Sequence, residues 1–160
     1  MQLLLRLLDE GFDRKAWHGP NLRGSIRGLD SAQASWRPAP GRHNIWEIIV
    51  HAAYWKYAVR RRLTGIKRGS FGLTGSNWFA RGDKAVEAAW RQDVALLEQE
   101  HQQLREVVAR LRESDLFRSA AGSRQSNVTL ISGIAAHDVY HAGQIQVLKR
   151  LFKAADEDQG

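Results

Sequence analysis

The chain has 160 residues, of which 43% are hydrophobic and 26% are charged, and its formal net charge is +7. This length fits one domain with a hydrophobic core and is short for two. The sequence contains no cysteine, which excludes disulfides, a protein thiol nucleophile and any thiolate metal site, so a bound metal would need histidine or carboxylate ligands.

The N-terminal part of the chain is predicted to form two short helical stretches. The segment "LLLRLLDEGF" has a helical apolar pattern, "WHGP" interrupts it, and Pro20 suits the first turn of a second stretch over residues 20–30. The N-terminus lacks the basic region and cleavage site of a signal peptide, and no segment reaches the ~20 apolar residues that span a bilayer. We therefore expect a soluble cytoplasmic protein that does not bind membranes.

A long helix follows the linker "WRPAPGR". We expect this helix to start near Asn44 and to end at Gly65, which can serve as its C-cap. Residues 65–82 are rich in glycine and too long for a simple turn, so they form either a crossover or part of a site rim. This loop is a candidate lid.

Two further long helices are predicted in the second half of the chain. Asp83 can cap a helix that runs to about residue 113, and a last helix spans about residues 128–153. Residues 154–160 form a polar C-terminal tail. Because apolar residues recur at spacings of three and four and strand-like alternation is hard to find, we predict a single all-α domain over residues 1–160, built as a helical bundle.

Two histidines interrupt the apolar stripe of the last helix. The residues of this stripe alternate between spacings of four and three, as in the buried contact line of a bundle: Leu130, Ile134, His137, His141, Gln144, Leu148 and Leu151. Interior polar groups need partners. Imidazoles one helical turn apart can both bind one metal ion. This spacing is weak evidence for a metal site on its own, but the buried position of the two histidines makes the evidence stronger.

The helix predicted over residues 44–65 adds a third histidine. Asn44, Glu47 and His51 fall on one side of the helical wheel, and the apolar neighbours of that side favour an interior position over a solvent stripe. If this side meets the last helix, His51, His137 and His141 form a three-histidine set without a strong fourth ligand. Three protein ligands and one open position are typical of catalytic metal sites, whereas structural sites are closed.

The other histidines have alternative roles. His101 lies on the apolar stripe of the helix predicted from Asp83 to about residue 113, where hydrogen bonding in the core is favoured over metal binding. His43 is expected at the surface or beside the metal ligands, and the position of His18 stays open. Glu47 could orient His51 or act as a base, and a simple pair within the helix is the alternative.

The segments "WRPAPGRHNIWEIIVHAAYWK" and "AAHDVYHAGQI" resemble the two signature regions of the DinB-like (DinB/YfiT) family of metal-binding four-helix proteins. The resemblance covers nearly the whole chain and is looser through the glycine-rich loop and the helix predicted from Asp83 to about residue 113. It implies an up-down-down-up four-helix bundle, frequent homodimers, and a divalent ion such as zinc or nickel on His51, His137 and His141. Some relatives transfer thiols, and others isomerise or hydrolyse small substrates.

The leading hypothesis is a metalloenzyme whose ion binds an exogenous low-molecular-weight thiol or a water molecule at its open position. The metal would lower the pKa of that group, giving S-transfer or hydrolysis on a small molecule. Glu47, Tyr140 and Gln144 are candidates for orienting ligands or substrate. The alternative is a metal-binding module without catalysis, or a binding module of the damage or stress response.

Basic residues crowd the C-terminal end of the helix predicted over residues 44–65 and the start of the following loop: Lys56, Arg60, Arg61, Arg62, Lys67 and Arg68. Such a cluster can bind nucleic acid, but the negative end of a helix dipole also favours cations. Because the sequence holds no recognisable nucleic-acid module, we favour a solvated helix end and do not expect nucleic acid as a partner. Arg61 and Arg62 could also attract an anionic thiol.

Overall fold

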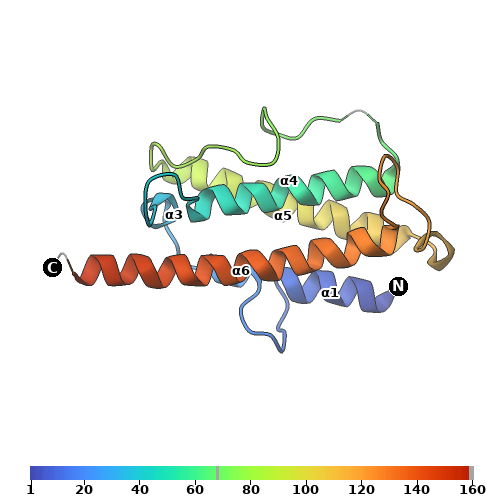
Figure 1. The fold of residues 1–160 in the computed structure, drawn as a ribbon, viewed down its shortest axis with the longest axis horizontal. Coiled ribbons are helices and arrows are strands. Elements are labelled where there is room, and N and C mark those ends of the chain that lie inside the picture. The colour runs from blue at the N-terminus through green and yellow to red at the C-terminus, as the bar shows by residue number, and fades with distance from the viewer. Residues whose placement is uncertain (68, 159–160) are drawn as a thin grey trace.

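The computed structural model describes residues 1–67 and 69–158 (Figure 1). In these residues the helices are α1 Gln2–Phe12, α2 Leu22–Ser25, α3 Ser31–Ser35, α4 Ile45–Thr64, α5 Glu87–Arg110, the short 3-10 helix η1 Glu113–Asp115, and α6 Asn127–Glu157. The described part of the chain contains no strand, only an isolated bridge between Ser119 and Ser126. The prediction of an all-α protein is therefore confirmed.

The four long helices lie side by side along one axis (Figure 1). α4 and α5 run in the same direction and are connected by the long segment 65–86, whereas α6 and α1 run the opposite way. α4 packs mainly on α5, α1 packs mainly on α6, and α4 also contacts α6 directly. This antiparallel contact between α4 and α6 brings distant parts of the sequence together.

Both ends of α4 follow from local sequence signals. Asn44 is the N-cap: its side chain accepts a hydrogen bond from the backbone N–H of Glu47, whose carboxylate accepts one from the N–H of Asn44. Gly65 ends the helix with φ of 71°, a left-handed conformation that glycine adopts at little cost. The predicted bounds of this helix are confirmed.

The next long helix starts later than predicted. Asp83 does not cap α5, which begins at Glu87 after the extended N-cap Val86. The Ser31 hydroxyl donates to the carbonyl of Ala85, and the Glu87 carboxylate accepts from the N–H of Ser31. These contacts with α3 hold the preceding segment outside the helix.

The other helix bounds also differ in part. The second predicted stretch holds only the four residues of α2, capped by Asn21. α3 was not predicted, although Asp30 and Gln33 form a capping box, which is a sequence signal for the start of a helix. α6 continues to Glu157 because the residues after Lys153 include good helix formers, and positions 159–160 of the predicted tail lie outside the described residues.

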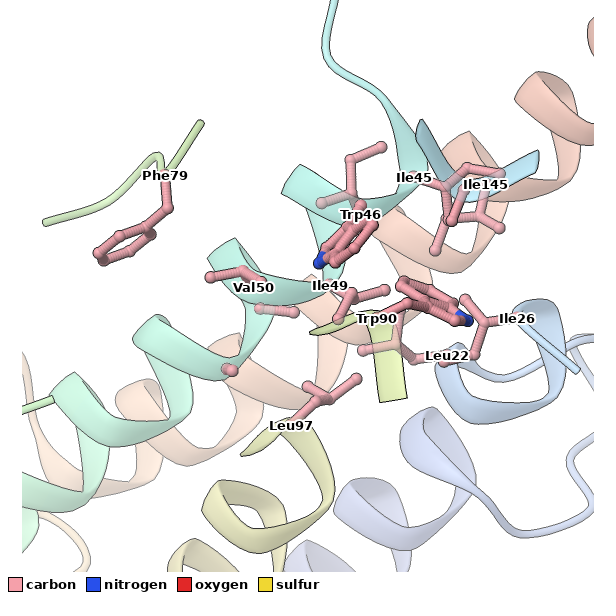
Figure 2. Close-up of a cluster of buried hydrophobic side chains, with 14 of the residues drawn as sticks. Leu22, Ile26, Ile45, Trp46, Ile49, Val50, Phe79, Trp90, Leu97 and Ile145 are labelled. Carbon is pink, nitrogen blue, oxygen red and sulfur yellow. The ribbon is translucent and has the colours of Figure 1, made fainter. Parts of the chain in front are cut away.

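The hydrophobic core consists of two clusters. Figure 2 shows the first, in which Trp46 and Ile49 of α4 pack with Trp90 of α5 and Ile145 of α6. The second cluster lies toward the other end of the bundle and includes Leu8, Leu104 and Ile131. The clusters hold α4 and α6 in a fixed register, which positions the site described below.

A group of buried polar residues accompanies these clusters. Lys56 of α4 and Asp138 of α6 form an ion pair, and both side chains are 0% exposed. The Lys56 ammonium also lies 3.4 Å from Nδ1 of His101 and 4.9 Å from the centroid of the Phe12 ring. Three long helices thus contribute to one polar contact inside the bundle.

No helix in the described part of the chain is long and apolar enough to cross a membrane.

Candidate metal centre

Three histidines converge between α4 and α6. Nε2 of His137 lies 3.1 Å from Nε2 of His51 and 3.1 Å from Nε2 of His141. One nitrogen from each residue lies within 4.8 Å of the others. His51 and His141 are buried, and His137 is half-buried. The residues that the helical pattern selected are thus brought together.

A backbone carbonyl orients His51. Nδ1 of His51 lies 2.9 Å from the carbonyl oxygen of Asn77, which can only accept, so Nδ1 carries the proton. The Nε2 lone pair of the neutral ring then faces the other histidines. Asn77 has a φ of 64°, unusual for a residue other than glycine, and its side chain accepts a hydrogen bond from Trp55 at 2.9 Å.

A side-chain amide orients His141 in the same way. Nδ1 of His141 donates to Oε1 of Gln144 at 2.7 Å, and Nε2 of Gln144 donates to the hydroxyl of Tyr140 at 3.0 Å. The acceptor fixes the tautomer and leaves the Nε2 lone pair of His141 free for a metal. In contrast, Nδ1 of His137 is buried and has no partner among the described residues.

Aromatic stacking closes the loop side of the site. Trp78 stacks on His51 with ring centroids 3.9 Å apart and on His43 with centroids 3.6 Å apart. His43 therefore lies beside the site and not in it. The segment that carries Asn77 and Trp78 belongs to the glycine-rich loop that the sequence marked as a site rim or lid.

The environment keeps the three imidazoles neutral. Burial lowers the pKa of His51, burial together with repulsion from His141 and His51 lowers the pKa of His137 to about 3, and burial lowers that of His141 to about 4. Neutral imidazole is the form that binds metals. The site is therefore ready to bind a cation near neutral pH without first losing protons.

The arrangement fits a tetrahedral metal ion. Zinc–nitrogen bonds of about 2.0–2.1 Å at tetrahedral angles place two ligand nitrogens about 3.3 Å apart. The two separations of 3.1 Å from Nε2 of His137 are close to that value, and the third pair of nitrogens lies within 4.8 Å. The Nε2 lone pairs of His51 and His141 point toward Nε2 of His137, and a cation placed between the three nitrogens would be bound by all three rings.

The contacts of Glu47 do not suit the role of a base. Its carboxylate forms an ion pair with Arg37, lies 2.9 Å from Nδ1 of His43, and caps α4. Although burial opposes it, the hydrogen bonds from Arg37 and His43 lower the pKa of Glu47 to about 2. A carboxylate with so low a pKa is a weak base.

His101 and His18 lie apart from the three histidines. The buried ring of His101 stacks on Phe12 with centroids 3.7 Å apart and contacts Lys56. Burial and the nearby Lys56 lower its pKa to about 2. His18 is exposed in the segment between α1 and α2. Among the described residues, the group that could hold a metal contains only His51, His137 and His141.

Two pockets adjoin the histidines along the contact between α4 and α6. The larger one has a volume of about 720 Å³, and apolar residues line it together with Arg42, His43, Trp78, Tyr140 and Gln144. The smaller one, of about 210 Å³, has His137 in its wall together with Arg62. A pocket of several hundred Å³ beside convergent polar groups is typical of small-molecule sites.

The sequence did not predict the roles of Asn77, Trp55 and Trp78. Asn77 acts through its backbone carbonyl, for which residue type gives no signal. The one available hint was the tryptophan that follows Asn77, in a loop already marked as a candidate rim.

Comparison with known families gives one match. The model described as the DinB superfamily matches residues 15–145. Neither the curated proteins nor the solved structures gave a match. The matched range contains both segments of the sequence that carry the histidines.

Proposed function

The chain belongs to the DinB superfamily, and from this premise we propose that it is a metal-dependent enzyme whose His51, His137 and His141 hold a divalent ion, zinc or nickel. The observation that carries the proposal is the convergence of three neutral imidazoles without a fourth histidine or carboxylate among the described residues. Catalytic sites keep such an open position, whereas structural sites fill it.

The proposed reaction is transfer of a thiol, or hydrolysis, on a small molecule. A divalent ion at this site supplies Lewis acidity that lowers the pKa of a thiol or water at its open position. In S-transfer, the thiol proton leaves to solvent, the sulfur electron pair forms a bond to an electrophilic carbon, and the leaving group departs with the electrons of the broken bond. With no cysteine in the chain, the thiol must come from outside.

The protein's own groups would orient and shield these reactants. The carbonyl of Asn77 and the amide of Gln144 hold the imidazoles of His51 and His141, and Trp78 covers the loop side. The Tyr140 hydroxyl accepts from Gln144, which leaves its own proton available for a substrate. The pocket of about 720 Å³ beside Trp78 is large enough for a small electrophile.

The family also suggests how the chain is arranged and assembled. We propose the up-down-down-up bundle of the family, which the directions of α1, α4, α5 and α6 support (Figure 1). Homodimerisation is likewise proposed from the family, and sedimentation analysis of the purified protein tests it.

The deciding experiment measures metal content in untagged protein. We expect about one divalent ion per chain in the wild type and none in His51→Ala, His137→Ala and His141→Ala, because two imidazoles bind far more weakly than three. His18→Ala and His43→Ala are matched controls that should keep the ion. Protein that stays metal-free after incubation with zinc and nickel would contradict the proposal. A screen of thiols with electrophiles then follows on the loaded protein.

A further inference from the structure

The groove between α4 and α6 has two chemically different ends. Because the helices are antiparallel, His51, His137 and His141 occupy its middle. Ile48, Val147 and Leu148 line the pocket on one side, toward the start of α4. The pocket on the other side lies toward the end of α4 and contains Arg62, Gln125 and Thr129.

Arg62 differs from the two arginines before it. Arg60 forms an ion pair with Glu100 at 2.9 Å, and Arg61 donates to the carbonyl oxygens of Ile66 and Lys67. The guanidinium of Arg62 makes no hydrogen bond or ion pair with any residue that the structure describes, although the side chain is half-buried in the pocket wall. A partly desolvated cation of this kind favours an anionic ligand.

The remaining lining of this pocket suits a carboxylate on an aliphatic arm. The side chains of Gln125 and Thr129 offer hydrogen bonds, and no aspartate or glutamate lines the pocket in the described part of the chain. Trp55, Val59 and Ile134 supply apolar walls, and His137 connects the pocket to the metal centre. One guanidinium balances a single negative charge, which favours a carboxylate over a phosphate.

We propose that the pocket around Arg62 binds the carboxylate of an acidic thiol whose sulfur reaches the three histidines, while the apolar pocket beside Trp78 and Tyr140 receives the electrophile. This inference rests on the proposed thiol function and deepens it, because it assigns the two reactants to opposite ends of one groove. It also favours a two-substrate transfer over hydrolysis, for which one pocket would suffice.

The spacing of the residues limits the size of the thiol. Arg62 follows His51 by eleven positions, which corresponds to about 16 Å along a helix. Helical side chains tilt toward the N-terminus, so the guanidinium lies nearer to the histidines than its Cα atom does. A peptide spans about 3.3–3.6 Å per residue, so about 16 Å sets an upper limit of about five residues. Because the reach of the Arg62 side chain shortens the gap, we expect the sulfur and the carboxylate to be separated by about two residues.

A ladder of short peptides tests this geometry. Acetyl-Cys, acetyl-Cys-Gly, acetyl-Cys-Gly-Gly and acetyl-Cys-Gly-Gly-Gly are prepared with a C-terminal carboxylate or a C-terminal amide, so each pair differs by one charge. Binding to cobalt-loaded protein is measured by the thiolate-to-cobalt absorption band. We expect the carboxylate form to bind about tenfold more tightly than the amide, mainly for the peptides with one or two glycines.

Two variants locate the effect. Arg62→Gln removes no side-chain hydrogen bond or ion pair with a described residue, and it should abolish the preference for the carboxylate while the affinity for the amide form is kept. Arg42→Gln, at the rim of the apolar pocket, is the matched control and should keep the preference.

Failure of this inference differs from failure of the proposed function. If both forms bind the wild type equally, or if Arg62→Gln keeps the preference, the carboxylate pocket is wrong and the thiol function stands. If neither form binds metal-loaded protein, the thiol function itself is wrong, and the carboxylate pocket falls with it.

Discussion

The carbonyl oxygen of Asn77 accepts a hydrogen bond from Nδ1 of His51 at 2.9 Å, so a loop residue fixes which nitrogen of a helical histidine faces the metal centre. The contact joins positions 26 residues apart in the sequence. It depends on the left-handed backbone of Asn77 and on the hydrogen bond that the Trp55 indole donates to the Asn77 side chain. Partners of this kind tune metal affinity although they do not touch the ion.

Asn77→Val is predicted to weaken metal binding. A β-branched side chain is strongly disfavoured at positive φ, so the backbone should change and the carbonyl should leave His51. We expect zinc affinity, measured by competition with a chromogenic chelator, to fall about tenfold or more. Asn77→Gly tolerates this backbone and should lose less. Equal affinity in the wild type and in Asn77→Val would show that the loop does not position His51.

Gln144 is predicted to hold His141 in the orientation that binds the metal. In Gln144→Leu, His141 loses the acceptor of its Nδ1 proton, and we expect metal affinity to fall about 10- to 100-fold. Gln144→Glu keeps an acceptor and should retain or increase the affinity, since a carboxylate makes the imidazole more basic. Gln146→Leu is the control, because the side chain of Gln146, also on α6, makes no hydrogen bond with a described residue. A Gln144→Leu variant with wild-type affinity contradicts this role.

The helices that carry the ligands could be predicted because their signals are local. Asn44 and Gly65 mark both ends of α4, and the alternation of apolar positions placed His137 and His141 on the inner side of α6. The resemblance in the two signature segments is confirmed by the family match. Caps and periodicity act over one or two turns, so sequence alone reveals them.

The features that the sequence did not predict depend on tertiary contacts, which leave no local pattern in the sequence. Lys56 was expected among the basic residues of a solvated helix end, but its 0% exposure follows from pairing with Asp138, 82 positions away. α5 starts later than predicted because Ser31 forms hydrogen bonds with Ala85 and Glu87. Arg68, the last residue of the predicted basic cluster, lies outside the described residues.

Glu47→Gln is predicted to lower stability without removing the metal. The carboxylate pairs with Arg37 and His43 and not with a metal ligand, and the loss of charged hydrogen bonds should cost about 1–3 kcal/mol at pH 7. Urea unfolding of both proteins gives this difference, and elemental analysis gives the metal content. Glu106→Gln, on the exposed side of α5, serves as the control.

The pH dependence of that difference follows from the pKa of Glu47. Hydrogen bonds lower it from 4.5 to about 2, so the stabilisation is fully present above pH 4.5 and is lost as the pH falls toward 2. The wild type should therefore approach Glu47→Gln in stability between pH 4.5 and 2. A difference that stays constant over this range would mean that the charge of Glu47 does not stabilise the fold.

Lys56→Met is predicted to be the most destabilising of these changes. Methionine fills a similar volume, but the substitution leaves Asp138 buried without its cation, and breaking a buried ion pair in this way costs about 3–5 kcal/mol. Adding Asp138→Leu removes the unpaired acid and should recover much of the loss, since well-packed apolar residues can replace buried ion pairs. The free energies of unfolding of the wild type, both single variants and the double variant give the coupling energy. Additive losses would show that the two charges do not stabilise each other.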